Sequence, residues 1–199
     1  MKKGKLFIIS GPSGAGKSTI IRAIMDRSEN AFFSVSATTR AMRPGEQDGV
    51  DYLFVTRERF QELIRVGGLL EWAEYVGNFY GTPAEPALRA LEEGRDVLLD
   101  IETRGARQVM EKYPEAVSIF VCTPSFAELE KRLRARGTNT EEDIRKRLTK
   151  GRSECEFADL YTYLIVNDDR ETAAAQAAAI LIAERCKDKA HLHEMLRGE

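Results

Sequence analysis

Short apolar runs alternate with longer segments of helical periodicity along most of the chain. The run "KLFIIS" precedes the helical pattern "STIIRAIMDRS", and the runs "RDVLLDI", "AVSIFVC" and "YLIVN" each precede another such segment. Apolar runs without polar alternation are typical of strands buried on both faces. Strands that alternate with helices predict parallel βαβ units with helices over both faces of the sheet. We therefore expect an α/β fold.

Residues 32–94 break this alternation. They contain the β-like pieces "FFSVS" and "VDYLFV", the turn signal "RPGEQDG" and a cluster of aromatic residues. Short strands separated by turn residues are typical of antiparallel pairing. These features predict an inserted lobe with an antiparallel or mixed sheet.

The segment "RARGTNTEEDIRKRL" is a second departure. Gly137 is expected to end one helix, and Thr140 followed by Asp143 resembles a capping box that opens the next helix. The pattern predicts a helix–turn–helix flap that carries arginines. The expected organisation is one domain over 1–199, with a core at 1–31, 95–124 and 156–199, an inserted lobe at 32–94 and a flap at 125–155.

Composition places the chain among ordinary globular proteins. It has 199 residues, of which 43% are hydrophobic and 31% charged, and this length suits one domain. A net charge of −2 gives no support to a surface for nucleic acid or anionic membranes. The apolar run in "MKKGKLFIIS" is too short for a signal peptide, and no segment reaches membrane-spanning length. We expect a cytoplasmic protein that binds neither nucleic acid nor membrane.

The cysteines and the C-terminal region carry less information. Cys122, Cys155 and Cys186 lie far apart without CxxC spacing, which predicts free buried thiols in a reducing compartment. The two histidines in "HLHE" are expected on the surface. The alanine-rich segment from Glu171 predicts a helix that packs on the core and frays at its end. The sequence leaves open whether this helix also forms a subunit contact in a homo-oligomer.

The segment "GPSGAGKS" between the first strand and the first helix matches the P-loop pattern. Its glycines let backbone N–H groups surround phosphate oxygens, and the following helix adds its positive N-terminal dipole. A lysine in this position reaches the β- and γ-phosphates, and the hydroxyl after it binds Mg²⁺. The predicted triphosphate-binding residues are Gly11, Pro12, Ser13, Gly14, Ala15, Gly16, Lys17, Ser18 and Thr19.

A second group of polar residues lies in the inserted region. In "SATTRAMRPGEQDGVDY", Arg40 and Arg43 stand near hydroxyls and are followed by Tyr52. Two guanidinium groups and a phenol suit a dianionic phosphate. Solvated surface arginines are the alternative interpretation of this pair, and the residues by themselves leave both open.

The segment "LLEWAEYVGNFYGTP" places Glu71 among apolar neighbours, with Tyr80 farther along. A carboxylate in such a setting can accept two hydrogen bonds from one edge of a base. Guanine offers two adjacent donors there, N1–H and the exocyclic amino group, where adenine offers an acceptor. Taken alone, this segment leaves open whether Glu71 contacts a base.

The chain resembles guanylate kinases over nearly its whole length. The segments that carry the resemblance appear in the same order and at similar spacing: "ISGPSGAGKST", "FSVSATTRAMRPGEQDGVDYLFV", "EWAEYVGNFYGTP", "LLDIETRGARQV", "KRLRARGTNTEEDIRKRL" and "YLIVNDD". The resemblance implies the Mg²⁺-dependent reaction ATP + GMP = ADP + GDP in purine nucleotide metabolism. It also implies a P-loop NTPase fold in which a parallel sheet flanked by helices carries a mixed-β GMP-binding lobe and a helical lid.

The resemblance further implies roles for individual residues. It assigns the GMP phosphate to Arg40, Arg43, Tyr52 and Tyr80. It assigns the guanine site to Ser36, Glu71, Gly81, Thr82 and Glu102. It assigns Mg²⁺ to Ser18 and Asp100, and the adenine end of ATP to Asn167. Catalytic roles fall to Lys17, Asp100 and the lid arginines Arg132, Arg136 and Arg147.

The chain departs from the family pattern at three of these positions or their neighbours. The family often has serine where this chain has Thr82, which keeps a hydroxyl. It commonly reads "DID.QG" where this chain has Glu102 and Arg104 in "DIETRG". The longer carboxylate and the added charge bear on the fine geometry of guanine contact, while the activity is still expected.

Two other functions compete with this interpretation. Guanylate-kinase-like modules of scaffold proteins keep the fold without the catalysis, but their P-loops are typically degraded, whereas Lys17 and Ser18 are intact here. A P-loop kinase for another nucleoside monophosphate or a sugar phosphate is the second alternative, against which Glu71 and Ser36 argue. A GTPase is disfavoured because the chain lacks an NKxD-like segment.

Overall fold

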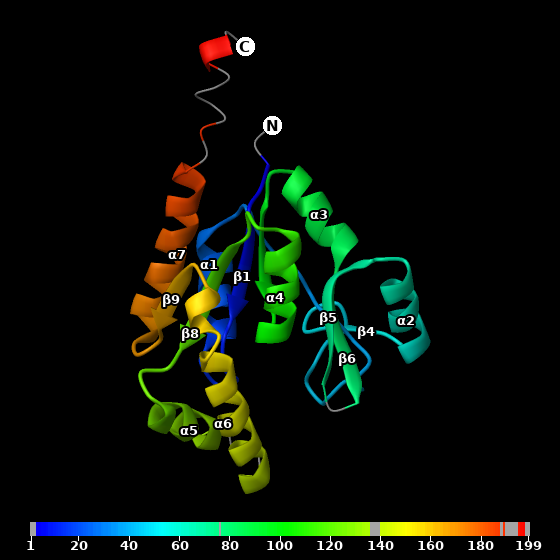
Figure 1. Cartoon of the computed structure of the whole chain (residues 1–199), viewed down its shortest axis with the longest axis vertical. Helices are drawn as coiled ribbons and strands as arrows, with labels where there is room; N and C mark the ends of the chain where they lie inside the picture. The colour runs from blue at the N-terminus through cyan, green and yellow to red at the C-terminus, as the bar shows by residue number, and fades with distance from the viewer. Residues whose placement is uncertain (1–2, 76, 136–139, 188, 190–194, 198–199) are drawn as a thin grey trace.

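A computed structural model describes residues 3–75, 77–135, 140–187, 189 and 195–197. Two sheets organise these residues, one of five strands and one of four (Figure 1). The five-stranded sheet has the order β2-β7-β1-β8-β9 and consists of β1 (Leu6–Ser10), β2 (Ala31–Phe33), β7 (Asp96–Asp100), β8 (Val117–Cys122) and β9 (Tyr163–Val166). All of its neighbouring strands pair in parallel, as the sequence predicts.

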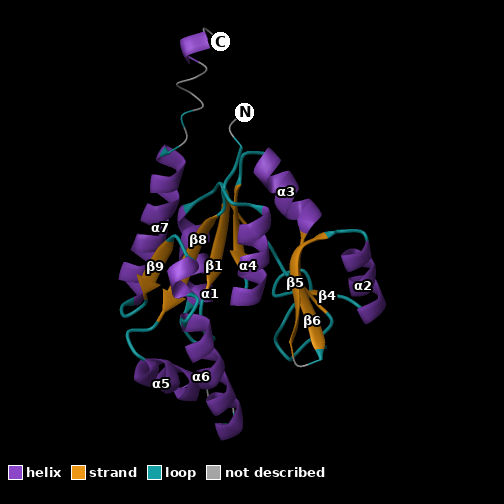
Figure 2. Ribbon diagram, viewed as in Figure 1, coloured by secondary structure: helices purple, strands orange, loops and turns teal. Residues whose placement is uncertain are grey.

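Helices cover both faces of the parallel sheet (Figure 2). The helices are α1 (Lys17–Arg27), α2 (Arg57–Arg65), α3 (Ala84–Glu92), α4 (Thr103–Lys112), α5 (Phe126–Ala135), α6 (Glu141–Cys155), the 3-10 helix η1 (Ala158–Leu160) and α7 (Arg170–Cys186). Successive residues of β1 point to opposite faces, so Phe7 and Ile9 pack with α1 and α7, while Leu6 and Ile8 pack with α3 and α4. Burial on both faces explains why β1, β7 and β8 have apolar cores, whereas the edge strand β9 leaves Leu164 and Val166 exposed.

The four-stranded sheet lies in the inserted region and has the order β4-β3-β6-β5. Its strands are β3 (Ala37–Thr38), β4 (Leu53–Phe54), β5 (Leu69–Tyr75) and β6 (Asn78–Pro83). One pair is parallel and two are antiparallel, which confirms the expected mixed pairing. Phe60 of α2 is fully buried against Leu69 and Phe79, and these residues form a small core separate from that of the parallel sheet. The helix α3 follows β6 directly and packs on the parallel sheet, so it ties the two sheets together.

The start of the inserted region differs from the prediction. The segment "FFSVS" was expected in the lobe, but Phe32 and Phe33 belong to β2 and pair with Val97 and Leu98 in the parallel sheet. This expectation is wrong because strand pairing depends on a partner strand that lies far along the chain. Neither α2 nor α3 was expected within residues 32–94.

The expected flap is a helical lid that consists of α5 and α6, which lie beyond the carboxyl ends of the parallel strands (Figure 1). The predicted capping box is present, because Thr140 and Asp143 exchange side-chain and backbone hydrogen bonds at the start of α6. Leu129, Leu133 and Ile144 are buried between the two helices. Gly137, expected to end the first of them, lies outside the described residues.

The remaining expectations concern the cysteines and the C-terminal region. All three cysteines are free, but only Cys122 and Cys155 are half-buried, while Cys186 is exposed at the end of α7. The expectation of buried thiols is therefore wrong for Cys186. The helix α7 packs on the core beside α1, which confirms the expected packing helix. Both histidines lie outside the described residues. Within the described part of the chain, no helix has the length and apolar character needed to cross a membrane.

Candidate nucleotide-binding site

The glycine-rich loop connects β1 to α1. Gly11, Gly14 and Gly16 adopt φ angles of 139°, 100° and 96°, which side chains strongly disfavour. A Cβ atom at Gly11 would lie 2.0 Å from the carbonyl oxygen of Val121 in β8, so glycine is required there for space as well. Gly16 is also the N-cap of α1 and leaves the first N–H groups of that helix without a side-chain cap. A loop of this shape can surround phosphate oxygens with N–H groups.

Lys17 and Asp100 meet at the mouth of the loop. The Lys17 Nζ donates to the carbonyl oxygen of Gly11 at 2.8 Å and lies 3.8 Å from Asp100 Oδ1. The register places Asp100 opposite Ile9, at the carboxyl end of the neighbouring strand β7. Ligands of open α/β sheets bind at these strand ends. Sheet topology therefore brings together two residues that are far apart in sequence.

Ser18 and Asp100 line the same cavity and offer hard oxygen ligands. No cluster of three or more His, Cys, Asp or Glu side chains in the described ranges could hold a metal by itself. A small divalent cation that keeps several waters and binds substrate phosphates fits such a sparse set of ligands. The donor set therefore suits a metal–nucleotide complex better than a permanently bound ion.

Asn167 stabilises the loop through a buried side-chain hydrogen bond. It is 4% exposed, and its Nδ2 donates to the carbonyl oxygen of Ala15 at 2.7 Å. Its backbone N–H donates to Cys122 at the end of β8, also at 2.7 Å. A Cβ atom at Gly16 would lie 2.2 Å from the same Nδ2 atom, so the loop glycine makes room for this amide. The expected contact between Asn167 and adenine stays a prediction.

The lid packs directly against the loop. Arg147 in α6 donates from Nη1 to Ser13 Oγ at 2.6 Å. Leu129 and Leu133 of α5 lie close to Gly14, where an added Cβ atom would be 3.2 Å from both side chains. Arg132 pairs instead with Glu128 of its own helix at 2.8 Å, and Arg136 lies outside the described residues. Of the two predicted catalytic lid arginines within the described residues, Arg147 touches the phosphate loop and Arg132 pairs within its own helix.

A single cavity of about 810 Å³ extends from the loop to the four-stranded sheet. The predicted site residues in its lining are Gly11, Ser13, Gly14, Gly16, Lys17, Ser18, Ser36, Tyr52, Glu71, Tyr80, Gly81, Asp100 and Glu102. The other described candidates lie outside this lining: Pro12, Ala15, Thr19, Arg40, Arg43, Thr82, Arg132, Arg147 and Asn167. The P-loop and the candidate guanine site therefore open into one space.

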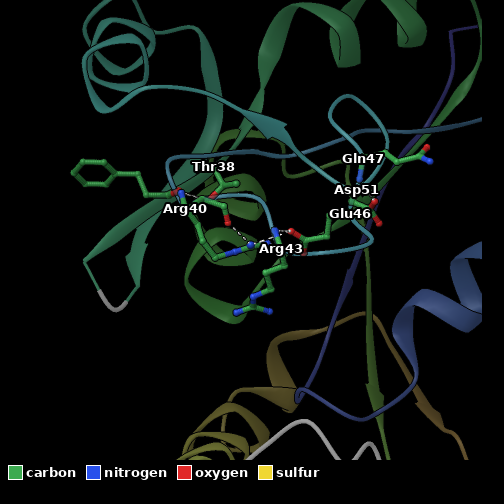
Figure 3. A network of polar contacts seen from close by, with 8 residues as sticks. Thr38, Arg40, Arg43, Glu46, Gln47 and Asp51 are labelled. Atoms are coloured by element: carbon green, nitrogen blue, oxygen red, sulfur yellow. Dashed lines mark hydrogen bonds and ion pairs between the residues drawn. The ribbon is translucent and has the colours of Figure 1, made fainter.

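Arg40 is held by a carboxylate that is not among the predicted site residues. Its Nη1 and Nη2 donate to the two oxygens of Glu46 at 2.9 and 2.8 Å (Figure 3). The guanidinium also lies over the rings of Tyr52 and Phe54, with its carbon 5.4 and 5.6 Å from the ring centroids. Such a fork-to-fork pair fixes the plane of the guanidinium. The only sequence signal was an acidic residue inside the turn "RPGEQ".

Arg43 and the tyrosines complete this group. The backbone N–H of Arg43 donates to Glu46 at 2.8 Å, while its side chain extends away from the pair (Figure 3). The rings of Tyr52 and Tyr80 meet edge to face at 6.0 Å. Burial and the nearby charge of Asp100 raise the pKa of Tyr52, so its phenol remains a proton donor at neutral pH. Arg40, Tyr52 and Tyr80 therefore place one guanidinium and two phenol groups next to one another.

Glu71 is the most deeply buried acid of the cavity, at 4% exposure. Thr82 is fully buried and donates from Oγ1 to Glu71 Oε1 at 2.7 Å. Desolvation raises the pKa of Glu71 to about 7; the hydrogen bond from Thr82 opposes this shift, and the charge of Glu102 adds to it. The Thr82 hydroxyl therefore orients Glu71, and the expected contact between Thr82 and the base stays a prediction.

Glu102 is paired with a lid residue that the sequence did not identify. Lys150 of α6 donates to Glu102 Oε2 at 2.6 Å and lies 3.5 Å from Glu154. Its ammonium also lies 4.4 Å from the ring centroid of Tyr75 in β5. One lysine thus contacts the lid, the core and the lobe. The sequence offered no signal for it except its place three residues after Arg147.

Comparison with known proteins agrees with this geometry. The family model for guanylate kinase matches residues 3–184. A guanylate kinase of Carboxydothermus hydrogenoformans is 51% identical over 95% of this chain and 93% of the relative. A guanylate kinase of Streptococcus pneumoniae is 50% identical over 98% of this chain and 95% of the relative. The crystal structure of guanylate kinase from Anaplasma phagocytophilum is 36% identical, with a TM-score of 0.81, and covers 100% of this chain and 96% of that one.

The fold and the loop define a nucleotide-binding protein of the P-loop class, with a parallel sheet flanked by helices. Within that class, the chain belongs to the guanylate kinase family.

Proposed function

We propose that this protein transfers the γ-phosphoryl group of ATP to GMP and produces ADP and GDP. The observation that carries this proposal is the single cavity that joins the P-loop to the buried carboxylate of Glu71. Relatives named guanylate kinase, about half of whose residues are identical, support the same reaction. No feature of the described site favours a non-catalytic binding module or another acceptor.

ATP would bind with its phosphates in the loop from Gly11 to Ser18. The Lys17 ammonium lies at the loop mouth, where it would contact the β- and γ-phosphates. Ser18 and Asp100 would hold Mg²⁺ together with phosphate oxygens and water. When bound, this ion neutralises charge on the transferring group. The adenine end would extend toward Asn167, as the family resemblance implies.

GMP would bind in the lobe. Its phosphate would take donors from Arg40, Arg43, Tyr52 and Tyr80, and it would compete with Glu46 for the Arg40 guanidinium. Its base would donate N1–H and N2–H to the ionised Glu71 carboxylate, which Thr82 orients. The other guanine-site positions are Ser36, Gly81 and Glu102.

The transfer itself needs alignment and charge stabilisation rather than a strong base. The attacking oxygen of GMP is already anionic at neutral pH, so no residue must remove a proton from it. Lys17, Arg132, Arg136 and Arg147 would stabilise the negative charge on the transferring group. Arg147 already lies against Ser13 of the phosphate loop. Closure of the lid and lobe over both substrates would exclude water as a competing acceptor.

A coupled assay of ADP production tests this proposal. The protein is mixed with ATP, Mg²⁺ and one of GMP, AMP, CMP or UMP. The expected result is turnover with GMP and little with the other three. Turnover with a different monophosphate would contradict the guanine assignment of Glu71. No turnover with any acceptor would contradict the enzymatic function.

A further inference from the structure

Gly105 lies in the first turn of α4, directly against the Glu71 carboxylate. A Cβ atom built on Gly105 would lie 2.2 Å from Glu71 Oε2 and 2.8 Å from its Cδ atom. Gly105 is not among the glycines with positive φ, so its backbone conformation would accept any side chain. The glycine is therefore required at this position for space and not for its dihedral angles.

We propose that Gly105 is a specificity-determining position of the GMP site. Because Gly105 has no side chain, the Glu71 carboxylate can occupy the space beside α4. Gly105 thereby determines the position of the carboxylate that would accept hydrogen bonds from guanine. Gly105 acts through Glu71 and is a positioning residue, not a catalytic one. The inference rests on the proposed function of Glu71 as the guanine acceptor.

The spacing between α4 and β5 is fixed by hydrogen bonds on both sides of Glu71. Gln108 donates from Nε2 to the carbonyl oxygen of Trp72 at 2.9 Å and accepts from its backbone N–H at 3.3 Å. Lys112 donates to the carbonyl oxygen of Leu70 at 3.1 Å. Positions 105, 108 and 112 share one face of the helix because they are three and four residues apart. This face is therefore attached to the strand residues immediately before and after Glu71.

An added methyl group at position 105 would consequently displace the carboxylate rather than the helix. The contact at 2.2 Å would have to lengthen to the ~3.5 Å of ordinary van der Waals contact. The colliding atoms lie at the end of a side chain, and alanine favours a helix over glycine, so the chain is expected to fold. The displaced carboxylate would lose its alignment with Thr82 and with the two guanine donors.

Steady-state kinetics of Gly105→Ala with GMP and with IMP, which lacks the 2-amino group, tests the proposal. We expect kcat/KM for GMP to fall at least tenfold, mainly through KM. The KM for ATP should stay within twofold, and the preference for GMP over IMP should shrink. In a Glu71→Ala background no carboxylate remains to be displaced, so Gly105→Ala should change kcat/KM by less than twofold. Glu111→Ala, an exposed change on the same helix, is the control for general effects on α4.

The outcomes separate the two proposals. If the parent protein phosphorylates GMP and Gly105→Ala keeps the parental GMP-to-IMP preference, the role of Gly105 is refuted while the function stands. If the parent does not phosphorylate GMP, both are refuted. If Gly105→Ala alone fails to fold, a second variant combines it with Glu71→Asp, whose side chain is one methylene shorter. This double variant should fold again and melt near the parental melting temperature. An unrestored melting temperature in that double variant would overturn the proposed steric coupling.

Discussion

The buried carboxylate of Glu71 should reduce the stability of the protein at neutral pH. Burial raises its pKa from 4.5 to about 7 in the folded state. Between these values the folded protein keeps a proton that the unfolded chain has released, so stability falls as pH rises through this window. The penalty is complete above pH 7 and absent well below pH 4.5. Glu71→Gln cannot ionise and should lack this pH-dependent loss.

The shift sets the size of the effect. At 1.36 kcal/mol per pKa unit, the full penalty is about 3 kcal/mol, and about 2–3 kcal/mol of it develops between pH 5 and pH 8. The amide oxygen of glutamine can accept the Thr82 hydrogen bond as the carboxylate does, and any fixed cost of the substitution is the same at both pH values. The change in relative stability between the two pH values therefore isolates ionisation.

Urea unfolding of the parent and Glu71→Gln at pH 5 and pH 8 measures this quantity. We expect the variant to gain about 2–3 kcal/mol relative to the parent on going from pH 5 to pH 8. Glu58→Gln is the matched control, because hydrogen bonds at the start of α2 lower the pKa of Glu58 and its contribution changes only below pH 4.5. A pH-independent difference, or a relative loss for Glu71→Gln at pH 8, would refute the raised pKa.

Three further substitutions test contacts around the site. Asn167→Ala leaves the buried carbonyl oxygen of Ala15 without its donor, so urea unfolding should show a loss of stability of about 1–3 kcal/mol. Kinetics should show a higher KM for ATP. An unchanged KM would contradict its support of the loop. Lys150→Met frees Glu102 from the lid and should raise the KM for GMP severalfold, whereas equal kinetics would mean that the ion pair is incidental. Gly11→Ala combines a disfavoured φ with a backbone collision and should lower the melting temperature strongly; a parental melting temperature would contradict that geometry.

The sequence predicted the parts of this protein that depend on local patterns. The phosphate loop is contiguous, so its glycines, lysine and serine identify it without a structure, and the alternation of strands and helices predicted the parallel sheet. The capping box at Thr140 was equally local. These features need no knowledge of distant contacts.

The features that escaped prediction depend on contacts between distant segments. The edge strand β2 was assigned to the wrong sheet because its partner, β7, lies far along the chain and begins only at Asp96. The pairing of Lys150 with Glu102 joins the lid to the core, and no spacing rule links those two positions. The fit between Gly105 and Glu71 is likewise visible only once α4 and β5 lie side by side.

The pair formed by Arg40 and Glu46 has a thermodynamic consequence for any anion that binds there. Without such an anion, the guanidinium already has an internal partner with matching bidentate geometry. An incoming anion exchanges one ion pair for another, so its affinity reflects the difference between the two pairs and not the whole strength of the new one. A dianion that also reaches Tyr52 can outcompete the internal carboxylate, whereas a simple monovalent anion gains little from the exchange. The exchange with Glu46 would therefore make the lobe favour a dianionic ligand over a monovalent one.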